Sequence, residues 1–345
     1  MTRKFIALVA AIGLAGAAWL TWDLYRPFRG FSAPMKVEIP PRTGAVAVSD
    51  LLVSQGVLRH RWAFLARYSV GRARRRLLKA GEYYFDRPLR PIDVYRKLAA
   101  GDVYLYSVTV PEGSDRFDIA RIVSDRLAIS PREFLRRTQQ SGLIHDIDPA
   151  AQSLEGYLFP ETYRFARGTT ADTVIATMVA RFRRVMQTKF RAELASNAGN
   201  LHAVVTLASL VEKETPDPAE RPLVAGVFAR RLDKGMLLQC DPTVIYAARL
   251  ADRMIGTIRQ SDLNYDSAFN TYVHAGLPPG PIANPGESSL RAAFRPADGH
   301  ALYFVSNNHG GHFFSATLAE HLRNVARYRK ESGARNRKAE AGGGG

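Results

Sequence analysis

The chain of 345 residues is poor in cysteine and in acidic side chains. Cys240 is the single cysteine, so an intrachain disulfide and a four-cysteine zinc site are both excluded. Asp and Glu number 32 against 48 Lys and Arg, which gives a net charge of +16. A charge of this size favours polyanionic partners, such as nucleic acid, anionic lipid or an acidic cell-wall polymer, without choosing among them.

Long apolar runs are scarce as well, and the one that stands out is at the beginning. Residues Phe5 to Trp22 are uncharged, follow Arg3 and Lys4, and are close to the lower length limit for crossing a bilayer. Aromatic residues gather at the far end of the run, as in an interfacial belt. We expect a transmembrane helix over 5–22, a cytoplasmic end over 1–4 and export of the rest. A cleaved signal peptide is the alternative, because Ala15-Gly16-Ala17 resembles a cleavage site.

The remaining chain is long enough for two or three compact units. Residues 23–35 form a linker with proline and glycine breakers, and 36–150 form a membrane-proximal α+β region. From 151 to 330 the helical segments lengthen, and the stiff loop 277–286 is rich in glycine and proline. The tail 331–345 is expected to be disordered. The predicted fold class is α+β, with small mixed sheets and a helix-rich second half.

Hydrophobic periodicity and breaker residues give the individual elements. One helix is expected to follow Ser49 as its N-cap. The predicted strands are 36–39, 81–85, 103–110, 301–306 and 312–315. The predicted helices are 50–55, 62–68, 91–99, 118–127, 131–139, 171–190, 204–214, 221–234, 243–249 and 318–330.

Two segments of the membrane-proximal region are loosely alike. Residues 36–56 and 107–127 both contain a strand, a proline-containing turn and a helix. The second copy is similar to the LysM-type glycan-binding pattern, so we interpret about 107–150 as LysM-like. A plain packing module is the alternative, because strand-turn-helix units are common.

A basic block between Arg59 and Lys79 raises the question of nucleic-acid binding. Trp62, Phe64 and Tyr68 accompany it, but at the spacing of a helix that packs into a core. No nucleic-acid motif is present. We therefore interpret the block as a solvated face near anionic lipid, and expect no nucleic-acid partner.

The segment Leu210-Val-Glu-Lys-Glu-Thr-Pro216 ends an apolar helical run that starts near His202. Pro216 lacks an amide donor and keeps Thr215 out of the helical region, so the helix should stop there. Glu212 and Glu214 then lie in the last turn, where burial and the negative helix end raise a carboxyl pKa. Such a glutamate suits general acid catalysis. An ordinary solvated helix end is the alternative.

Several ordered motifs resemble the YceG-like, or MltG, endolytic murein transglycosylases of bacterial inner membranes. The resemblance covers most of residues 36–330 and is specific because long motifs recur in family order. The motifs are Leu154-Glu-Gly-Tyr-Leu-Phe-Pro-Glu-Thr-Tyr163, Leu210-Val-Glu-Lys-Glu-Thr215, Leu238-Gln-Cys-Asp-Pro-Thr-Val-Ile-Tyr246, Asn270–Gly286, Leu302-Tyr-Phe-Val305 and Gly310-Gly-His-Phe-Phe-Ser315.

The resemblance implies cleavage of the bond between N-acetylmuramic acid and N-acetylglucosamine inside glycan strands, leaving a 1,6-anhydro end. It places the catalytic glutamate at Glu212, as general acid and then base. Spacing alone does not choose, since Glu214 has the more apolar helical neighbours. Residues two apart on a helix do not face one another, so Glu212 and Glu214 are a poor acid–nucleophile pair. A non-catalytic wall-binding scaffold and a water-using muramidase are the competing functions.

Other polar residues of the motifs are candidate substrate-groove residues, with capping or loop bracing as the alternative for each. These are Glu161, Gln239, Asp241, Asn270, Tyr272 and Glu320. We expect no cofactor and no metal, because His300, His309, His312 and His321 lack the spacing of a known metal motif.

The resemblance also implies a single-pass inner-membrane protein with its catalytic domain, 151–330, on the periplasmic side. The partners implied are glycan strands, the membrane and penicillin-binding protein synthases. Two positions depart from the family pattern: Cys240 replaces a more usual Ser or Thr, and Leu322 stands where Asn commonly follows His321.

Overall fold

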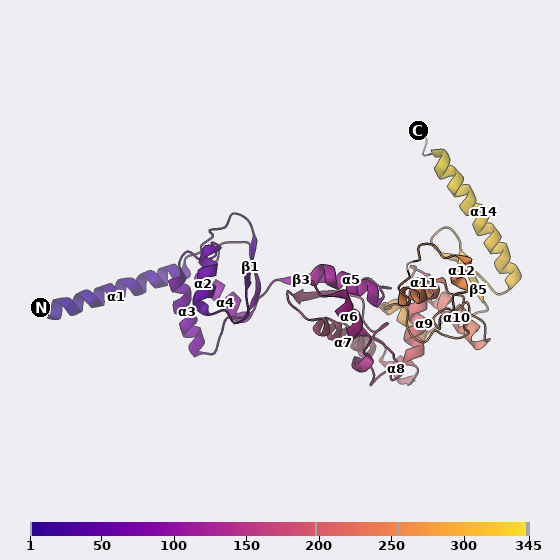
Figure 1. Ribbon diagram of the computed structural model, residues 1–345, viewed down its shortest axis with the longest axis horizontal. Helices are drawn as coiled ribbons and strands as arrows, with labels where there is room; N and C mark the ends of the chain where they lie inside the picture. The colour runs from indigo at the N-terminus through magenta and orange to yellow at the C-terminus, as the bar shows by residue number, and fades with distance from the viewer. Residues whose placement is uncertain (1, 197–198, 254, 343–345) are drawn as a thin grey trace. The chain divides into compact units, whose positions relative to one another are not determined.

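The computed structural model describes residues 2–196, 199–253 and 255–342, and the chain divides into two compact units (Figure 1). The first unit extends to Ser107 and adds the short segment Arg164–Thr169. The second contains Val108–Tyr163 and the chain from Thr170 onward. The division therefore falls after Ser107, whereas the sequence analysis placed the start of the catalytic domain at 151. The α+β class is confirmed.

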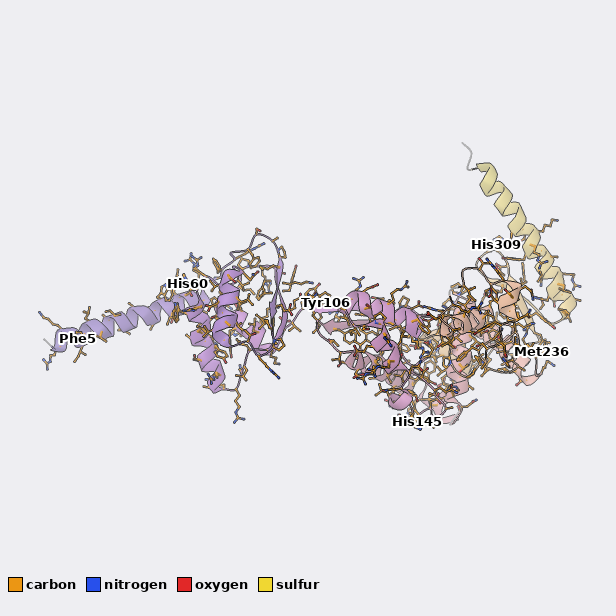
Figure 2. The ribbon with its side chains drawn as sticks, viewed as in Figure 1. Phe5, His60, Tyr106, His145, Met236 and His309 are labelled. Carbon is orange, nitrogen blue, oxygen red and sulfur yellow. The ribbon has the colours of Figure 1, made fainter. Side chains whose placement is uncertain are left out.

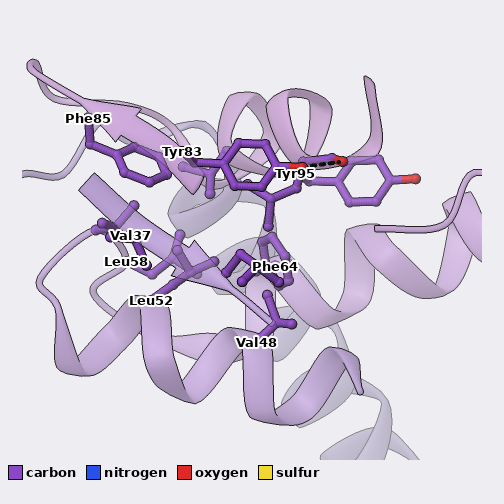
Figure 3. Close-up of a cluster of buried hydrophobic side chains, with 12 residues drawn as sticks. Val37, Val48, Leu52, Leu58, Phe64, Tyr83, Phe85 and Tyr95 are labelled. Carbon is purple, nitrogen blue, oxygen red and sulfur yellow. Dashed lines mark hydrogen bonds between the residues drawn. The ribbon is translucent and has the colours of Figure 1, made fainter. Parts of the chain in front are cut away.

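The first unit encloses its own core between a two-stranded antiparallel sheet and three helices (Figure 3). In the antiparallel sheet Val37 lies opposite Tyr83, and alternate side chains point inward. Leu52 and Phe64 are fully buried against them. The elements are α1 Thr2–Tyr25, β1 Met35–Ile39, α2 Ala45–Ser54, α3 Arg61–Ala73, β2 Gly81–Phe85 and α4 Pro91–Ala100.

Helix α1 carries the apolar run. Its segment Arg3–Tyr25 has a mean hydropathy of 1.9, and none of the apolar window is buried. Phe5, labelled in Figure 2, is 68% exposed. These features suggest a single-pass membrane anchor, and a signal sequence would have the same features.

The LysM-like interpretation is not confirmed. Strand β3, Leu105–Thr109, pairs with β4, Thr162–Ala166, so its partner lies outside residues 107–150. The division between the units falls inside β3. Residues 110–150 instead supply helices to the second unit.

The second unit is mostly helical. Helix α9 contacts α10, α11 and α13, and the antiparallel pair β5–β6 places Tyr303 opposite Ser315. The elements are α5 Arg116–Leu127, α6 Pro131–Thr138, η1 Ser141–Leu143, α7 Ala171–Lys189, α8 Arg191–Ser196, α9 Leu201–Glu214, α10 Arg221–Asp233, α11 Asp241–Leu250, α12 Gln260–Leu263, α13 Glu287–Phe294, β5 Tyr303–Ser306, β6 His312–Ser315 and α14 Leu318–Gly342.

Two predicted boundaries were wrong. Helix α2 begins at Ala45, and Ser49 is a buried interior residue whose hydroxyl donates to the Val46 carbonyl rather than capping the helix. Helix α14 continues to Gly342, so residues 331–342 are helical rather than disordered. Charged residues such as Glu331, paired with Arg327 one turn earlier, support this extension. Residues 343–345 lie outside the described residues.

Candidate active site

The C-terminal end of α9 positions Glu212 and Glu214. The helix has a run of buried side chains from Val204 to Val211. Thr215 has extended backbone angles, φ −137° and ψ 130°, directly before Pro216. The predicted helix end is therefore confirmed, and Glu214 is the last helical residue.

Glu214 lines a cavity of about 320 Å³. The helix end brings Glu214 to it, the segment before α11 adds polar groups, and β5 and α14 contribute the opposite side. The lining residues are Glu214, Arg231, Leu238, Gln239, Asp241, Tyr272, Phe304, Val305, His321 and Val325. A concave site with a few convergent polar groups is typical of ligand binding.

The carboxyl group of Glu214 is well suited to hold a proton. The pKa of Glu214 is raised to about 7, chiefly by burial. A hydrogen bond from the Cys240 thiol opposes this rise, the negative charge of Asp241 adds to it, and the nearby His312 opposes it. A carboxyl group with a pKa near neutrality can donate a proton and then take one back.

Glu212 has different surroundings. Its Oε1 lies 2.8 Å from Nη2 of Arg221, and its Oε2 accepts from the backbone amide of Gly286 at 2.9 Å. The two side chains of this ion pair are 4% and 6% exposed. Glu212 is not among the residues that line the cavity. Both carboxylate oxygens of Glu212 are therefore engaged within the protein, and the catalytic role of Glu212 stays a prediction.

Three of the predicted groove residues are brought together in the cavity: Gln239, Asp241 and Tyr272. The Tyr272 hydroxyl donates to Oδ1 of Asp241 at 2.5 Å, and burial followed by this bond raises the pKa of Tyr272. Gln239 has a φ of 53°, a left-handed conformation that is uncommon outside glycine. Its side-chain oxygen lies 3.5 Å from Nη1 of Arg231.

The other three candidates do not reach the cavity. Glu161 is paired with Arg181 on the surface. Asn270 is fully buried and braces its own loop, since Nδ2 donates to the carbonyls of Leu263 and Tyr265. Glu320 accepts from the amide of Ala316 at the start of α14. These hydrogen bonds are of the bracing and capping kind, and a substrate-binding role for Asn270 and Glu320 stays a prediction.

Arg231 and His321 are cavity residues that the sequence analysis did not propose. Arg231 is 8% exposed and donates to the carbonyls of Leu302 and Leu238, so it braces the cavity wall. His321 stacks on Tyr303 with ring centroids 5.2 Å apart. Burial and then the charge of Arg231 lower the pKa of His321, which favours the neutral imidazole. The one feature of the sequence that could have indicated His321 is that it follows the Gly310–Ser315 motif closely.

Histidine placement also bears on metal binding. His312 donates its backbone amide to Glu220, and Nδ1 of its ring lies 2.6 Å from the Glu220 carboxylate. In the described part of the chain, no three His, Cys, Asp or Glu residues are grouped as metal ligands. Leu322, at the position of a common family Asn, is 57% exposed and lies outside the cavity lining.

The chain matches the model of the YceG-like family over residues 37–327. It belongs to the YceG-like family. A crystal structure of a YceG-like protein from Listeria monocytogenes is 31% identical, covers 84% of this chain and 98% of its own, and superimposes with a TM-score of 0.58.

Curated relatives agree with this assignment. The endolytic murein transglycosylase of Bacillus subtilis strain 168 is 32% identical over 85% of this chain and 84% of its own length. The protein of the same name from Streptococcus pneumoniae strain D39 is 27% identical over 94% of this chain and 64% of its own length. The family identification made from the motifs is confirmed, and so is the enzyme class, lytic transglycosylase, that these relatives' names carry.

Proposed function

We propose that this chain cleaves murein glycan strands internally, in the cavity at the end of α9, and that Glu214 is the general acid and base. The observation that carries the proposal is the half-buried Glu214, which lines a cavity of about 320 Å³ and has its pKa raised to about 7. The same cavity contains three polar residues from two family motifs, Gln239, Asp241 and Tyr272. The activity named for the relatives fits this arrangement.

The proposed reaction is an exchange within the substrate. The protonated Glu214 carboxyl donates to the glycosidic oxygen as the bond from that oxygen to C1 of N-acetylmuramic acid breaks. The resulting carboxylate accepts the proton of the C6 hydroxyl on the same sugar. The C6 oxygen then bonds to C1 and closes a 1,6-anhydro ring. Atoms balance without water, and Glu214 regains its proton for the next cycle.

The choice of Glu214 replaces the prediction of Glu212 for a geometric reason. A proton donor must reach the bond that it cleaves. Both carboxylate oxygens of Glu212 are occupied, one by Arg221 and the other by the amide of Gly286. We propose instead that Glu212 holds the segment around Gly286 against α9, behind the site.

Location and partners follow from the same proposal. An anchored α1 places the rest of the chain at the bacterial inner membrane, and a murein substrate requires the periplasmic side. Cleavage next to the membrane suits termination of nascent strands, so penicillin-binding protein synthases are the expected neighbours.

Hydrolysis by water is the second candidate, because the cavity contains another carboxylate. Asp241 is exposed and is bonded to Tyr272, so it is placed to act on a water molecule. Mass spectrometry of products from purified glycan strands separates the two reactions. Anhydro ends support the lytic reaction, and reducing ends support hydrolysis. No cleavage by the wild-type protein, with retained strand binding, would support a scaffold.

A further inference from the structure

A second cavity, of about 260 Å³, lies in the same unit. Its polar lining includes Arg116, Gln139, Gln152 and His202. None of these residues lines the Glu214 cavity. The motif loop Leu277–Gly286 contributes Pro279 to Pro281 to the wall of this cavity and none of its residues to the lining of the Glu214 cavity.

Arg116 is the unusual member of this lining. It is only 5% exposed, yet it forms no ion pair with any described carboxylate. Its Nε atom is buried and lacks an acceptor among the described residues. With the Gln139 amide oriented to match its neighbours, the Gln139 oxygen accepts from Nη1 and Nη2 at 3.1 and 3.3 Å. A neutral amide does not balance the charge of a buried guanidinium.

The nearby acidic groups are engaged elsewhere. Asp115 and Asp118 both pair with Arg249. Glu155 accepts from the backbone amide of Arg116, and burial raises the pKa of Glu155 to about 8, which favours its neutral form. The charge of Arg116 lowers the pKa of Glu155, but the guanidinium forms no ion pair with a carboxylate of the described residues.

His202 adds to the positive character of the cavity. Its Nε2 lies 2.9 Å from the carbonyl oxygen of Pro279, and its Nδ1 lies 3.1 Å from Oδ2 of Asp148. Both ring nitrogens face acceptors, and the Asp148 hydrogen bond raises the pKa of His202, which favours the imidazolium form that donates from both. Asp148 also accepts from the Tyr157 hydroxyl and offsets the imidazolium charge. Arg116 remains the cation that has no ion pair among the described residues and a buried Nε without an acceptor.

The rest of the wall is apolar and shares elements with the Glu214 cavity. Leu250, Phe269 and Pro281 form apolar surface. Helix α11 contributes Asp241 to the first cavity and Leu250 to the second, so the two lie about 14 Å apart along it, at 1.5 Å per residue.

We propose that this second cavity binds a peptide carboxylate of the substrate, with the guanidinium of Arg116 as its partner. The inference rests on the proposed function, since murein carries short peptides on its muramic acid residues. Arginine binds carboxylates through paired, charge-assisted hydrogen bonds. The apolar wall would contact the aliphatic part of the same peptide. Recognition of the peptide would then position the sugar that carries it near Glu214.

The test measures equilibrium binding of an N-acetylmuramyl tripeptide with free carboxylates to the full-length protein in detergent. The same tripeptide with its carboxylates amidated is the first comparison, and we expect at least a tenfold weaker affinity. The corresponding tripeptide without the sugar should also show the dependence on free carboxylates. Equal affinity for the free and amidated ligands would overturn the proposal, as would acetate binding as tightly as the tripeptide.

Two variants in the cavity lining and one control outside it test whether the ligand binds in this cavity. Gln152→Glu adds a negative charge at an exposed lining position and should weaken binding of the free acid at least tenfold. Gln187→Glu adds the same charge on the exposed face of α7, outside the cavity lining, and should leave binding unchanged. Arg116→Lys keeps the charge but removes the paired donors, so it should lose selectivity for the carboxylate.

The two proposals fail separately. Wild-type protein that cleaves strands to anhydro ends but binds both ligands alike refutes only the carboxylate site. Protein that binds the free acid selectively but cleaves nothing refutes only the proposed function. Equal effects of Gln152→Glu and Gln187→Glu would mean that net charge, not this cavity, governs binding, and would overturn the inference.

Discussion

The two glutamates at the end of α9 lie two residues apart and have opposite surroundings. Glu212 lies in a closed ion pair with Arg221 and accepts from the Gly286 amide. Glu214 lines a cavity and forms no ion pair among the described residues, and His312 lowers its pKa less than burial raises it. One helix end thus separates a carboxylate that holds the fold together from a carboxyl that can exchange a proton.

The difference shows what burial does with and without a counter-charge. A buried carboxylate beside a guanidinium gains an ion pair and hydrogen bonds. A buried carboxyl without such a partner is better accommodated in its neutral form. The general acid is therefore expected where a cation is missing, and helix spacing alone cannot show where that is.

Removing the proton of Glu214 should have a larger effect on activity than any other change considered below. Glu214→Gln keeps the shape and removes the transferable proton, so strand cleavage should fall by about a thousandfold or more. The melting temperature of the full-length protein should stay within about 2 °C of wild type, because no ion pair is lost. Cleavage above a tenth of the wild-type rate would contradict the assignment.

The second prediction tests whether Glu212 stabilises the fold. Glu212→Gln leaves the buried guanidinium of Arg221 without its closest carboxylate and should lower the free energy of unfolding by about 2–4 kcal/mol. Thermal unfolding of the detergent-solubilised chain checks the direction. A second change, Arg221→Gln, should restore part of the loss, since the unpaired charge is gone. An unchanged melting temperature in Glu212→Gln would refute the structural role.

The pH dependence of cleavage tests whether the proton donor has the raised pKa of Glu214. The proton donor must be protonated, and the pKa of Glu214 is raised to about 7. The rate should therefore be full well below pH 7 and fall about tenfold per unit above it. A carboxyl at its ordinary pKa would already lose activity above about pH 5. A profile of kcat/KM against pH that declines there would count against Glu214 in this environment.

The smallest expected effect concerns Cys240, whose thiol donates to the Glu214 carboxylate. A hydroxyl is a stronger donor than a thiol, so Cys240→Ser should lower the pKa of Glu214 and move the alkaline limb down by about half a unit. Cys240→Ala removes the donor, so it should raise the pKa of Glu214 and move the alkaline limb of the pH–rate profile to higher pH. Shifts of the same sign in both variants would refute the hydrogen bond as the cause.

Much of the local structure was predictable because single residues fix it. Pro91 and Pro131 begin helices α4 and α6 at the predicted residues, and Pro216 follows the end of α9 as predicted. Ser49 was misleading because its hydroxyl bonds inside the helix, while Gly44 precedes the first turn. A serine in an apolar stretch signals a cap or an interior residue equally well.

The site was predictable only in part, for a related reason. Motif membership identified Gln239, Asp241 and Tyr272, which the structure gathers around one cavity. It did not separate Glu212 from Glu214, because Arg221 lies nine residues further along, on the next helix. An ion pair between two helices, such as Glu212–Arg221, cannot be predicted from the residue spacing within one helix.

The most direct measurement compares Glu212→Gln and Glu214→Gln in one assay of anhydro-ended products, at pH 6 and per folded molecule. We expect Glu212→Gln to retain at least a tenth of the wild-type rate and Glu214→Gln to form products at less than a thousandth of it. The reverse order, with Glu214→Gln active and Glu212→Gln silent although folded, would contradict the assignment of the proton donor.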